Sequence, residues 1–282
     1  MRVELRSEPG SAERENEDWV GASSGVFVVV DGAGSPPELG TGCSHGVAWY
    51  ATRLGSTALG FGEDRDRSLV DALGLAIADV AALHADTCDL THPGTPSAAI
   101  ALARRTGEGS SSRLEYAVLA DCSVLIVGRR HAEVITDRRE ASAGAEFLTA
   151  GAWSPIDAPG HLDEIASYME RMRAHRNKPG GFWVAASDPS AASEAIHGSR
   201  ELEDAAAVVL LSDGASRPID LFQNMTPEEL VTRLTVSGST AFLADLRDWE
   251  RSDPNGVTWP RAKRHDDASV VAWFHDERQV QR

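Results

Sequence analysis

The chain has 282 residues, of which 42% are hydrophobic and 25% charged, values typical of a globular protein with a sizeable core. Acidic residues outnumber basic ones by 43 to 27, and the net charge of −16 argues against binding to nucleic acid or to an anionic membrane, since both carry the same sign. Because the sequence has neither a long apolar run nor a signal-peptide core, a cytoplasmic protein is expected.

The hydrophobic pattern predicts clusters of strands and pairs of helices. In chain order, strands are expected at 3–5, 18–22 and 25–30, helices at 44–57 and 68–88, and further strands at 98–103, 114–119, 124–128 and 133–136. The last third is expected to hold strands at 182–186 and 207–211, helices at 215–222, 227–236 and 239–250, and a closing strand at 269–274. This order favours α+β layers with antiparallel sheets over a doubly wound parallel sheet.

The stretch 137–180 interrupts the strand pattern. It holds the Pro/Gly-rich segment SPIDAPGHLDE and a predicted helix at 162–173. We interpret it as a flap inserted into the strand scaffold. Because no linker divides the rest of the sequence, residues 1–282 are expected to form a single domain.

Cysteine and histidine do not suggest a metal site. The three cysteines, Cys43, Cys88 and Cys122, are odd in number and far apart, and no CxxC, HxxxH or HExxH spacing occurs. Neither a disulfide framework nor a zinc site is therefore expected. His45, at the start of a predicted helix, is interpreted as a packed or solvated side chain in preference to a proton donor for a leaving group.

Acidic residues stand where apolar strands begin or end. The five places are NED (residues 16–18), VVVDGAG around Asp31, LADCS around Asp121, VLLSDGAS around Asp213, and HDDAS at Asp266 and Asp267. Each alone is compatible with a simple turn. Five such places, spread over the chain, are expected to converge at one edge of a core, where carboxylates repel one another unless a cation neutralises them. Oxygen ligands favour Mn²⁺ or Mg²⁺.

In this order, the five elements resemble the motifs of the metal-dependent type 2C (PPM) serine/threonine protein phosphatases. That family carries [N/E]-x-D, DG-x-G, G-D-S, S-D-G and D-[DN]-x-[TS], and here the elements run from residue 16 to 269. The resemblance implies a four-layer αββα fold, in which a β-sandwich of two antiparallel sheets is flanked by helices.

The resemblance also implies a role for each acid. Asp31 corresponds to the carboxylate that bridges two metal ions, with the Gly32 carbonyl on one of them, and Asp213 and Asp266 correspond to ligands of the first metal. Asp18 corresponds to the acid that holds metal-bound waters. Asp121 corresponds to a ligand of a weaker third ion, shared with Asp213.

Several residues near these acids are less settled. Asp267 is the reserve for Asp266, and Glu17 stands where some relatives carry a second acid. The family's phosphate-binding arginine falls on Glu13 here, one residue before Arg14, and a local bulge would restore Arg14 to that role. The G-D-S element has Ala120 and Cys122 beside Asp121, a change expected to alter packing more than ligation.

The implied activity is hydrolysis of phosphoserine or phosphothreonine by a water that two metal ions activate. The implied partners are a phosphorylated protein and a cognate kinase, with no nucleic acid and no membrane. Two alternatives stay open: a non-catalytic binding module on the same fold, and a phosphatase of a small phosphorylated metabolite.

Overall fold

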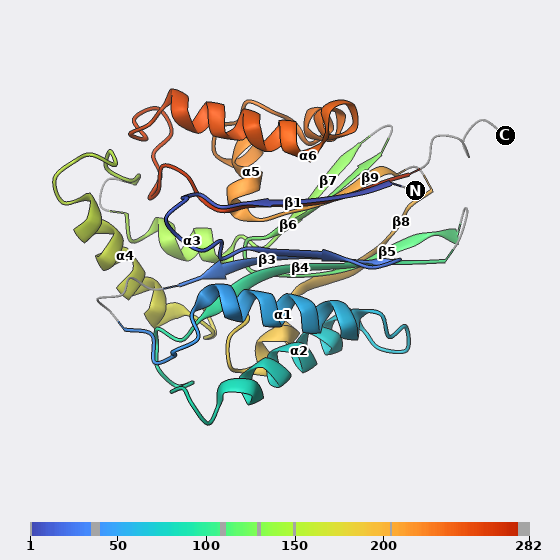
Figure 1. Ribbon diagram of the computed structural model, residues 1–282, viewed down its shortest axis with the longest axis horizontal. Helices are drawn as coiled ribbons and strands as arrows, with labels where there is room; N and C mark the ends of the chain where they lie inside the picture. The colour runs from blue at the N-terminus through green and yellow to red at the C-terminus, as the bar shows by residue number, and fades with distance from the viewer. Residues whose placement is uncertain are drawn as a thin grey trace.

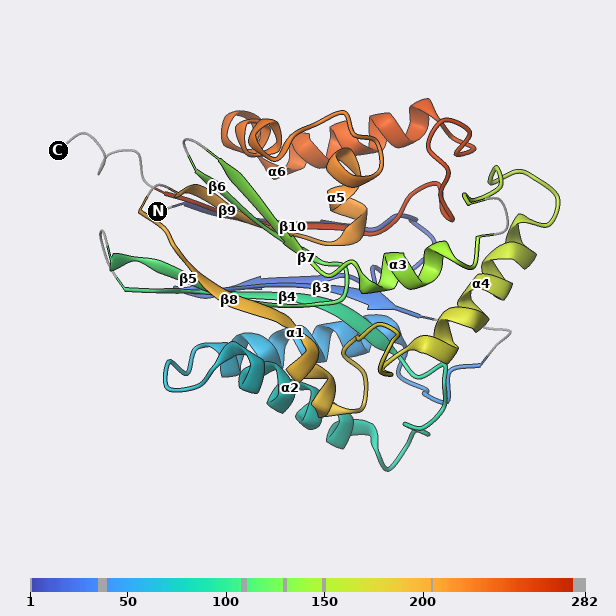
Figure 2. The same cartoon turned by 180° about the vertical axis from the view of Figure 1, so that it is seen from behind.

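The computed structural model describes residues 2–34, 40–107, 111–128, 131–148, 151–203 and 205–275. Two five-stranded antiparallel sheets pack face to face, and helices cover both outer faces (Figures 1 and 2). The first sheet has the order β1 (Arg2–Glu8), β10 (Ala268–Phe274), β9 (Ala205–Leu211), β6 (Ser123–Gly128) and β7 (Ala132–Thr136). The second has the order β2 (Trp19–Ala22), β3 (Val26–Ala33), β4 (Ser97–Thr106), β5 (Arg113–Leu119) and β8 (Ile196–Glu201).

The run VFVVV in β3 shows why the strands read as continuous apolar segments. Phe27 and Val29 face the core between the sheets, whereas Val26, Val28 and Val30 face the helices α1 (Val47–Gly62) and α2 (Leu69–His84). A strand covered on both faces needs apolar residues at every position, not at alternate ones. The same holds for β9 and β10, covered by α5 (Asp213–Asp220) and α6 (Pro227–Ser252). The expected four-layer αββα arrangement is confirmed.

Helix α6 consists of two helical segments joined at Gly238. A capping box between Thr226 and Glu229 fixes its start. Gly238 has φ 81° and ψ 170°, a left-handed conformation that favours glycine, and interrupts the helix. The freed N–H of Ser239 donates to the carboxylate of Glu4 in β1 at 2.8 Å. The two predicted helices at 227–236 and 239–250 correspond to these two segments.

The predicted flap lies across one end of the sandwich and contains two helices, α3 (Arg139–Ala145) and α4 (His161–His175) (Figure 1). Helix α4 confirms the expected helix, whereas α3 has no expected counterpart. Hydrogen bonds near both ends of α4 hold the flap to the rest of the chain. His161 contacts the Ala262 carbonyl oxygen at 3.0 Å, and Arg176 donates to the carbonyl oxygen of Pro93 at 2.8 Å and to Ser97 Oγ at 3.1 Å. The single-domain organisation stays a prediction.

One predicted strand is wrong and one was missed. Residues 182–186 form no strand, and pair with β4 only at the isolated bridge between Ala185 and Ala98. Both sides of β4 are already occupied by β3 and β5, so little of its edge remains. The missed strand is β8, whose sequence IHGSRE lacks apolar alternation because it is an edge strand with a largely exposed surface. A 3₁₀ helix, η3 (Pro189–Glu194), precedes it.

In the described ranges, no helix is both long enough and apolar enough to cross a membrane.

Candidate functional site

The acids predicted to converge do come together in space, at the end of the sandwich where β3 ends and α5 begins (Figure 1). Asp31 lies in β3 and Asp213 is the first residue of α5, and the backbone N–H of Asp213 donates to Asp31 Oδ2 at 3.2 Å. Asp18 precedes β2, Asp121 lies between β5 and β6, and Asp266 precedes β10. We call Asp18, Asp31, Asp121, Asp213 and Asp266 the carboxylate cluster.

The charges of these carboxylates act on one another. Burial raises the pKa of Asp31 well above its usual range, and the charges of Asp213, Asp18 and Asp121 raise it further. Burial likewise raises the pKa of Asp18 to about 8, against hydrogen bonds from Ser269 and Ser212 that lower it. Buried acids with raised pKa values mark functional sites more often than structural ones, because folding gains nothing from their repulsion.

The cluster suits hard divalent cations. Asp18 Oδ2 is buried and has no hydrogen-bond partner in the described ranges, so an acceptor oxygen is left for another ligand. All the side chains in the cluster offer oxygen, the ligand that Mn²⁺ and Mg²⁺ prefer. The residues present therefore fit the implied cations.

Asp266 and Asp267 have different surroundings. Asp267 accepts hydrogen bonds from the backbone N–H groups of Gly10 and Glu17, at 2.7 and 2.6 Å, and so fixes the turn before β2. Asp266 raises the pKa of Asp213 more than any other charge does. These contacts favour Asp266 as the ligand and give Asp267 a positioning role.

The glycines that follow Asp31 and Asp213 are required by close contacts. A Cβ on Gly32 would lie 2.4 Å from the carbonyl oxygen of Glu17, and one on Gly214 would lie 2.0 Å from that of Asp267. The Asp-Gly pairs are not hairpin turns here: the first lies in β3 and the second opens α5. Each glycine allows another acidic segment to approach the backbone.

A cation pair holds Asp266. Lys263 Nζ lies 2.9 Å from its Oδ1, and Arg217 Nη2 lies 3.0 Å from its Oδ2. Arg217 also pairs at 2.5 Å with the fully buried Glu250, which pairs in turn with Arg247 at 2.8 Å and His265 at 2.6 Å. Burial raises the pKa of Asp266, whereas the charges of Lys263 and Arg217 lower it. The net result is a lowered pKa.

Glu140 is a sixth acid that sequence reasoning missed. It lies in the first turn of α3, and burial together with the charges of Asp213 and Asp137 raises its pKa to about 7. It is also the charge that most raises the pKa of Asp121. No family motif covers this residue. The only signal was its place, four residues after the strand that ends at Thr136.

We predict that Glu140→Gln raises the Mn²⁺ concentration needed for half-maximal phosphate-ester hydrolysis by about 10-fold. The reason is that a neutral amide attracts a cation near Asp121 and Asp213 less than a carboxylate does. The measurement is a metal titration at saturating substrate. Glu146→Gln, at the exposed end of the same helix, is the control. Equal metal requirements for both variants would show that Glu140 takes no part.

Metal-free protein is expected to lose stability as pH rises. Asp18 has a pKa of about 8 in the folded state, against an ordinary value of 3.8, so between these two pH values the folded chain holds a proton that the unfolded chain has released. Stability therefore falls between about pH 4 and about pH 8. Thermal melts in chelator test this, and a smaller fall is expected with Mn²⁺ or in Asp18→Asn. An equal slope in all three samples would contradict the prediction.

Arg14, the predicted phosphate ligand, is exposed on the turn before β2. In the described ranges it forms no hydrogen bond, and its charge acts on Glu17, whose pKa is nevertheless raised by burial. Arg173 of the flap donates at 3.5 Å to the Gly40 carbonyl oxygen. Neither arginine contacts a member of the carboxylate cluster.

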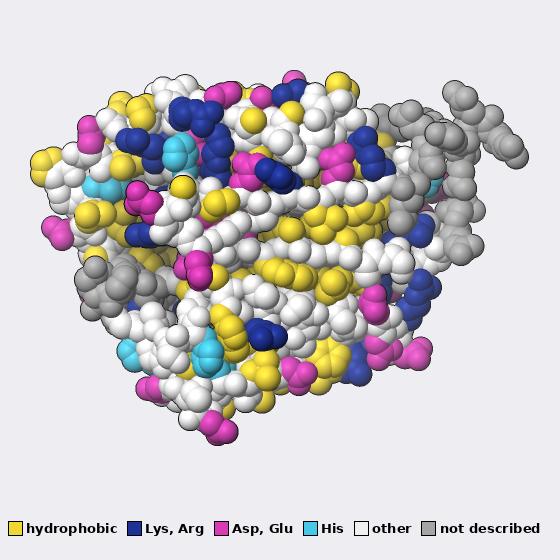
Figure 3. All heavy atoms as spheres, in the orientation of Figure 1, with side chains coloured by type: hydrophobic (Ala, Val, Ile, Leu, Met, Phe, Trp, Pro, Cys, Tyr) yellow, Lys and Arg dark blue, Asp and Glu magenta, His cyan; other side chains and the backbone are white. Residues whose placement is uncertain are grey.

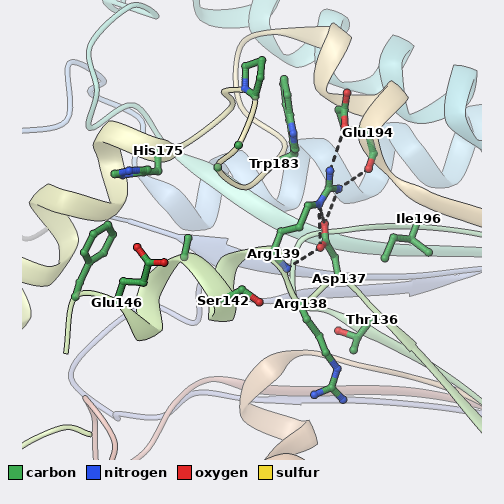
Figure 4. Close-up of a pocket in the computed structure, with 15 residues that line it drawn as sticks. Thr136, Asp137, Arg138, Arg139, Ser142, Glu146, His175, Trp183, Glu194 and Ile196 are labelled. Carbon is green, nitrogen blue, oxygen red and sulfur yellow. Dashed lines mark hydrogen bonds and ion pairs between the residues drawn. The ribbon is translucent and has the colours of Figure 1, made fainter. Parts of the chain in front are cut away.

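An open cleft of 980 Å³ lies beside the cluster, between α3 and the loop that follows α4 (Figure 4). Arg139 crosses it and pairs with Asp137 at 2.7 Å and Glu194 at 3.1 Å, while Trp183 and His175 line another side. Neither the clustered aspartates nor Glu140 line this cleft. The cleft is thus adjacent to the cluster and separate from it.

The surface carries mixed charge. In the view of Figure 3, basic and acidic side chains alternate over the helical layers, and hydrophobic side chains form a band along the open edge of the sandwich.

The fold is shared with solved serine/threonine phosphatases. No protein-family model matches the chain, and no curated protein matches it in sequence. Mycobacterium tuberculosis PstP/Ppp is 17% identical with a TM-score of 0.58, covering 98% of this chain and 99% of that one. Staphylococcus aureus Stp1 is 13% identical with a TM-score of 0.55, covering 97% and 94%.

Two further structures contain ligands. The catalytic domain of PstP in complex with 2 manganese ions is 17% identical, with 98% of both chains covered and a TM-score of 0.55. The PPM Ser-Thr phosphatase MsPP of Mycobacterium smegmatis, in complex with cacodylate, is 16% identical, with 96% of this chain and 97% of that one covered and a TM-score of 0.54. This chain therefore has the fold of the PPM phosphatases.

Proposed function

We propose that the protein is a metal-dependent phosphatase that hydrolyses phosphoserine and phosphothreonine monoesters. The observation that carries the proposal is the convergence of the five aspartates, with Asp31 and Asp213 in hydrogen-bond contact at the centre. The shared fold supports it, because the solved structures of this fold include a phosphatase with manganese ions.

The chain supplies the ligands and their support. Asp31, the Gly32 carbonyl, Asp213 and Asp266 would hold two ions, with Asp213 and Asp266 serving the first of them. Asp18 would orient the attacking water, and Asp121 with Asp213 would hold a weaker third ion. Bound Mn²⁺ or Mg²⁺ supplies an acidified water and neutralises charge on the phosphoryl oxygens.

Residues that contact the proposed ligands hold them in place. The Asp213 N–H positions the Asp31 carboxylate, and Arg217 with Lys263 positions Asp266. Such support matters because a ligand that shifts by an ångström lowers the affinity for metal.

The direct test is hydrolysis of a chromogenic phosphate ester by the purified chain. Activity is expected with Mn²⁺ or Mg²⁺ and is expected to disappear in chelator. A protein that neither hydrolyses the ester nor gains thermal stability from millimolar Mn²⁺ would instead be a binding module. A panel of phosphopeptides set against small phosphorylated metabolites then tests the substrate class, and preference for the metabolites would overturn the protein-phosphatase part.

Two further proposals concern the location of the protein in the cell and its partners there. We infer a cytoplasmic enzyme that acts on phosphorylated proteins and opposes a cognate kinase. The net charge of −16 supports a role away from nucleic acid and anionic membranes. Isolation of phosphoproteins that accumulate when the gene is deleted would identify the substrates.

Arg14 is proposed to bind the substrate phosphate. Arg14→Ala is expected to raise KM by about 10-fold and to change kcat less, because ground state and transition state carry the same charge for the guanidinium. Steady-state kinetics on a phosphopeptide measure the two constants. Arg6→Ala is the matched control, since Arg6 is also exposed and pairs with Glu8 away from the cluster. An unchanged KM would exclude Arg14 and direct attention to Arg173.

A further inference from the structure

A second cluster of metal-ligating side chains lies outside the carboxylate cluster. The ligand atoms of Cys43, His45, His84 and Cys88 all lie within 4.8 Å of one another. In the described ranges, no other group of three or more His, Cys, Asp or Glu side chains meets this spacing. We call these four residues the Cys₂His₂ cluster. We propose that it is a structural zinc site.

The four residues come from two separate segments. Cys43 and His45 lie in the turn before α1, whereas His84 is the last residue of α2 and Cys88 follows one turn later. Because α1 and α2 run antiparallel, the start of one meets the end of the other at one end of the molecule (Figures 1 and 2). The backbone N–H of Asp89 donates to the Gly42 carbonyl oxygen at 2.8 Å and joins the two segments directly.

The distances between the ligand atoms are close to those of a tetrahedral site, and the Sγ–Sγ distance is the one that zinc would lengthen. The Sγ atoms of Cys43 and Cys88 are 3.2 Å apart, and Nδ1 of His45 lies 3.3 Å from Cys88 Sγ and 3.7 Å from Cys43 Sγ. Nδ1 of His84 lies 3.5 Å from Cys43 Sγ. Zinc with Zn–S of about 2.3 Å and Zn–N of about 2.0–2.1 Å separates its tetrahedral ligands by about 3.3–3.8 Å.

The surroundings favour a thiolate at Cys88, whereas burial raises the pKa of Cys43. The backbone N–H of His45 donates to Cys43 Sγ at 3.5 Å. Burial disfavours ionisation of Cys88, but hydrogen bonds from Cys43, the Ser44 backbone, Thr87 and His84 outweigh it and lower the Cys88 pKa to about 5. Zinc binds the deprotonated sulfur, so donors that stabilise a thiolate also prepare a ligand.

The geometry distinguishes a metal site from a Cys–His nucleophile. A catalytic pair needs one thiol and one imidazole with an open side for substrate. Here both imidazoles turn Nδ1 towards Cys43 Sγ, and His45 Nδ1 also lies near Cys88 Sγ, while His84 is only 1% exposed. His45 stacks on Trp49 with 4.3 Å between ring centroids, which holds its ring in place. Cys43, His45 and Cys88 are not fully buried, so the distinction rests on the number of ligands: four side chains fill every position of a tetrahedral ion and leave none for substrate.

The site would brace the chain next to the carboxylate cluster. Val47, two residues after His45, is so close to Gly32 that a Cβ on that glycine would lie 2.6 Å from Val47 Cγ1. Gly32 follows Asp31 in β3. Zinc bound at the Cys₂His₂ cluster would therefore fix the start of α1, and through Val47 the backbone beside Asp31.

The first experiment measures zinc in protein made with zinc in the medium, purified with a reductant and dialysed. One equivalent per chain is expected. Cys43→Ser and Cys88→Ser are each expected to weaken zinc binding by more than about 100-fold, beyond the 10–100-fold typical of a lost supporting partner. Cys122→Ala, which removes the thiol buried in the sandwich core, and Asp213→Asn in the carboxylate cluster are both expected to keep the zinc.

The second experiment uses wild-type protein alone, in case the serine variants do not fold. Cobalt exchanged into the chain is expected to give the absorption of a tetrahedral ion with thiolate-to-metal charge transfer. Bound zinc is expected to protect Cys43 and Cys88 from alkylation, as read by peptide mass spectrometry. Absence of retained zinc, its loss in Asp213→Asn alone, or a Cys43–Cys88 disulfide in protein kept under reductant would each overturn the proposal.

Discussion

Asp213→Asn is expected to lower metal-dependent phosphate-ester hydrolysis by at least about 100-fold, a loss of about 2.7 kcal/mol of transition-state stabilisation. Asp213 contacts Asp31 through its own N–H, which the substitution keeps, so the fold is retained. The substitution removes one negative charge. In the proposed roles Asp213 is a ligand of the first ion and, with Asp121, of the weaker third ion, so both sites lose that charge. Kinetics across a range of Mn²⁺ concentrations measure the effect.

The stability of the same variant provides an independent readout. Burial and the charge of Asp266 raise the pKa of Asp213, so its ionised form is repelled in the metal-free state. Without metal, Asp213→Asn is expected to melt at the wild-type temperature or above it, and with Mn²⁺ it is expected to gain less. Asp220→Asn, an exposed acid at the other end of α5, is the control for helix effects. Near-normal turnover in Asp213→Asn at limiting Mn²⁺ would refute the dinuclear proposal.

Glu250→Gln is expected to cost about 3–5 kcal/mol of unfolding free energy. Glu250 is fully buried and accepts from Arg217, Arg247 and His265, at 2.5, 2.8 and 2.6 Å. Removing its charge leaves two arginines close together with no common counter-ion, and an uncompensated buried charge is far more costly than a missing surface pair. Denaturant unfolding with a shared slope measures the difference.

The matched control for Glu250 is Glu228→Gln, an exposed residue in the first turn of the same helix. It is expected to change the stability by less than about 0.5 kcal/mol. Because Arg217 also holds Asp266, Glu250→Gln should additionally raise the metal requirement. A variant as stable as Glu228→Gln would show that the buried network adds nothing to the fold.

The fold was predictable because its signals are local and repeated. Strand β3 and strand β9 read as apolar runs, and the break in α6 is encoded by Gly238 between two helical patterns. The edge strand β8 and helix α3 escaped prediction because their sequences, IHGSRE and REASAGA, are largely polar and have no periodic apolar face. Such elements form through pairing and packing with partners far along the chain, which a local pattern does not contain.

The grouping of the carboxylate cluster could be predicted from the sequence, whereas the Cys₂His₂ cluster could not. The acids stand at strand ends in a recognisable order, so Asp31, Asp121 and Asp213 could be grouped without coordinates, and their roles as ligands stay a prediction. Cys43 and Cys88 are separated by 45 residues, and only the antiparallel packing of α1 on α2 brings them together. Their separation along the sequence therefore gave no sign that the two Sγ atoms lie 3.2 Å apart, and the expectation of no zinc site stays untested.

Ala120 has a backbone conformation that is unfavourable for alanine, which comparison with the motif alone did not reveal. It occupies the glycine position of the G-D-S element and has φ 63°, a left-handed conformation that costs a residue with a Cβ about 1–2 kcal/mol. The strained residue directly precedes Asp121, and Cys122 beyond it is fully buried. Strain of this kind persists only where the neighbouring structure holds it in place.

The position of β10 has a consequence for the order of events during synthesis. This strand comes last among those described, yet it lies inside its sheet, between β1 and β9. Until the ribosome has released residues 266–274, β1 has no neighbour to pair with and the carboxylate cluster lacks Asp266. A nascent chain can therefore assemble the second sheet before this strand emerges, but not the complete carboxylate cluster. The first sheet and the cluster are completed by the same late event, at the cost of slow, long-range folding.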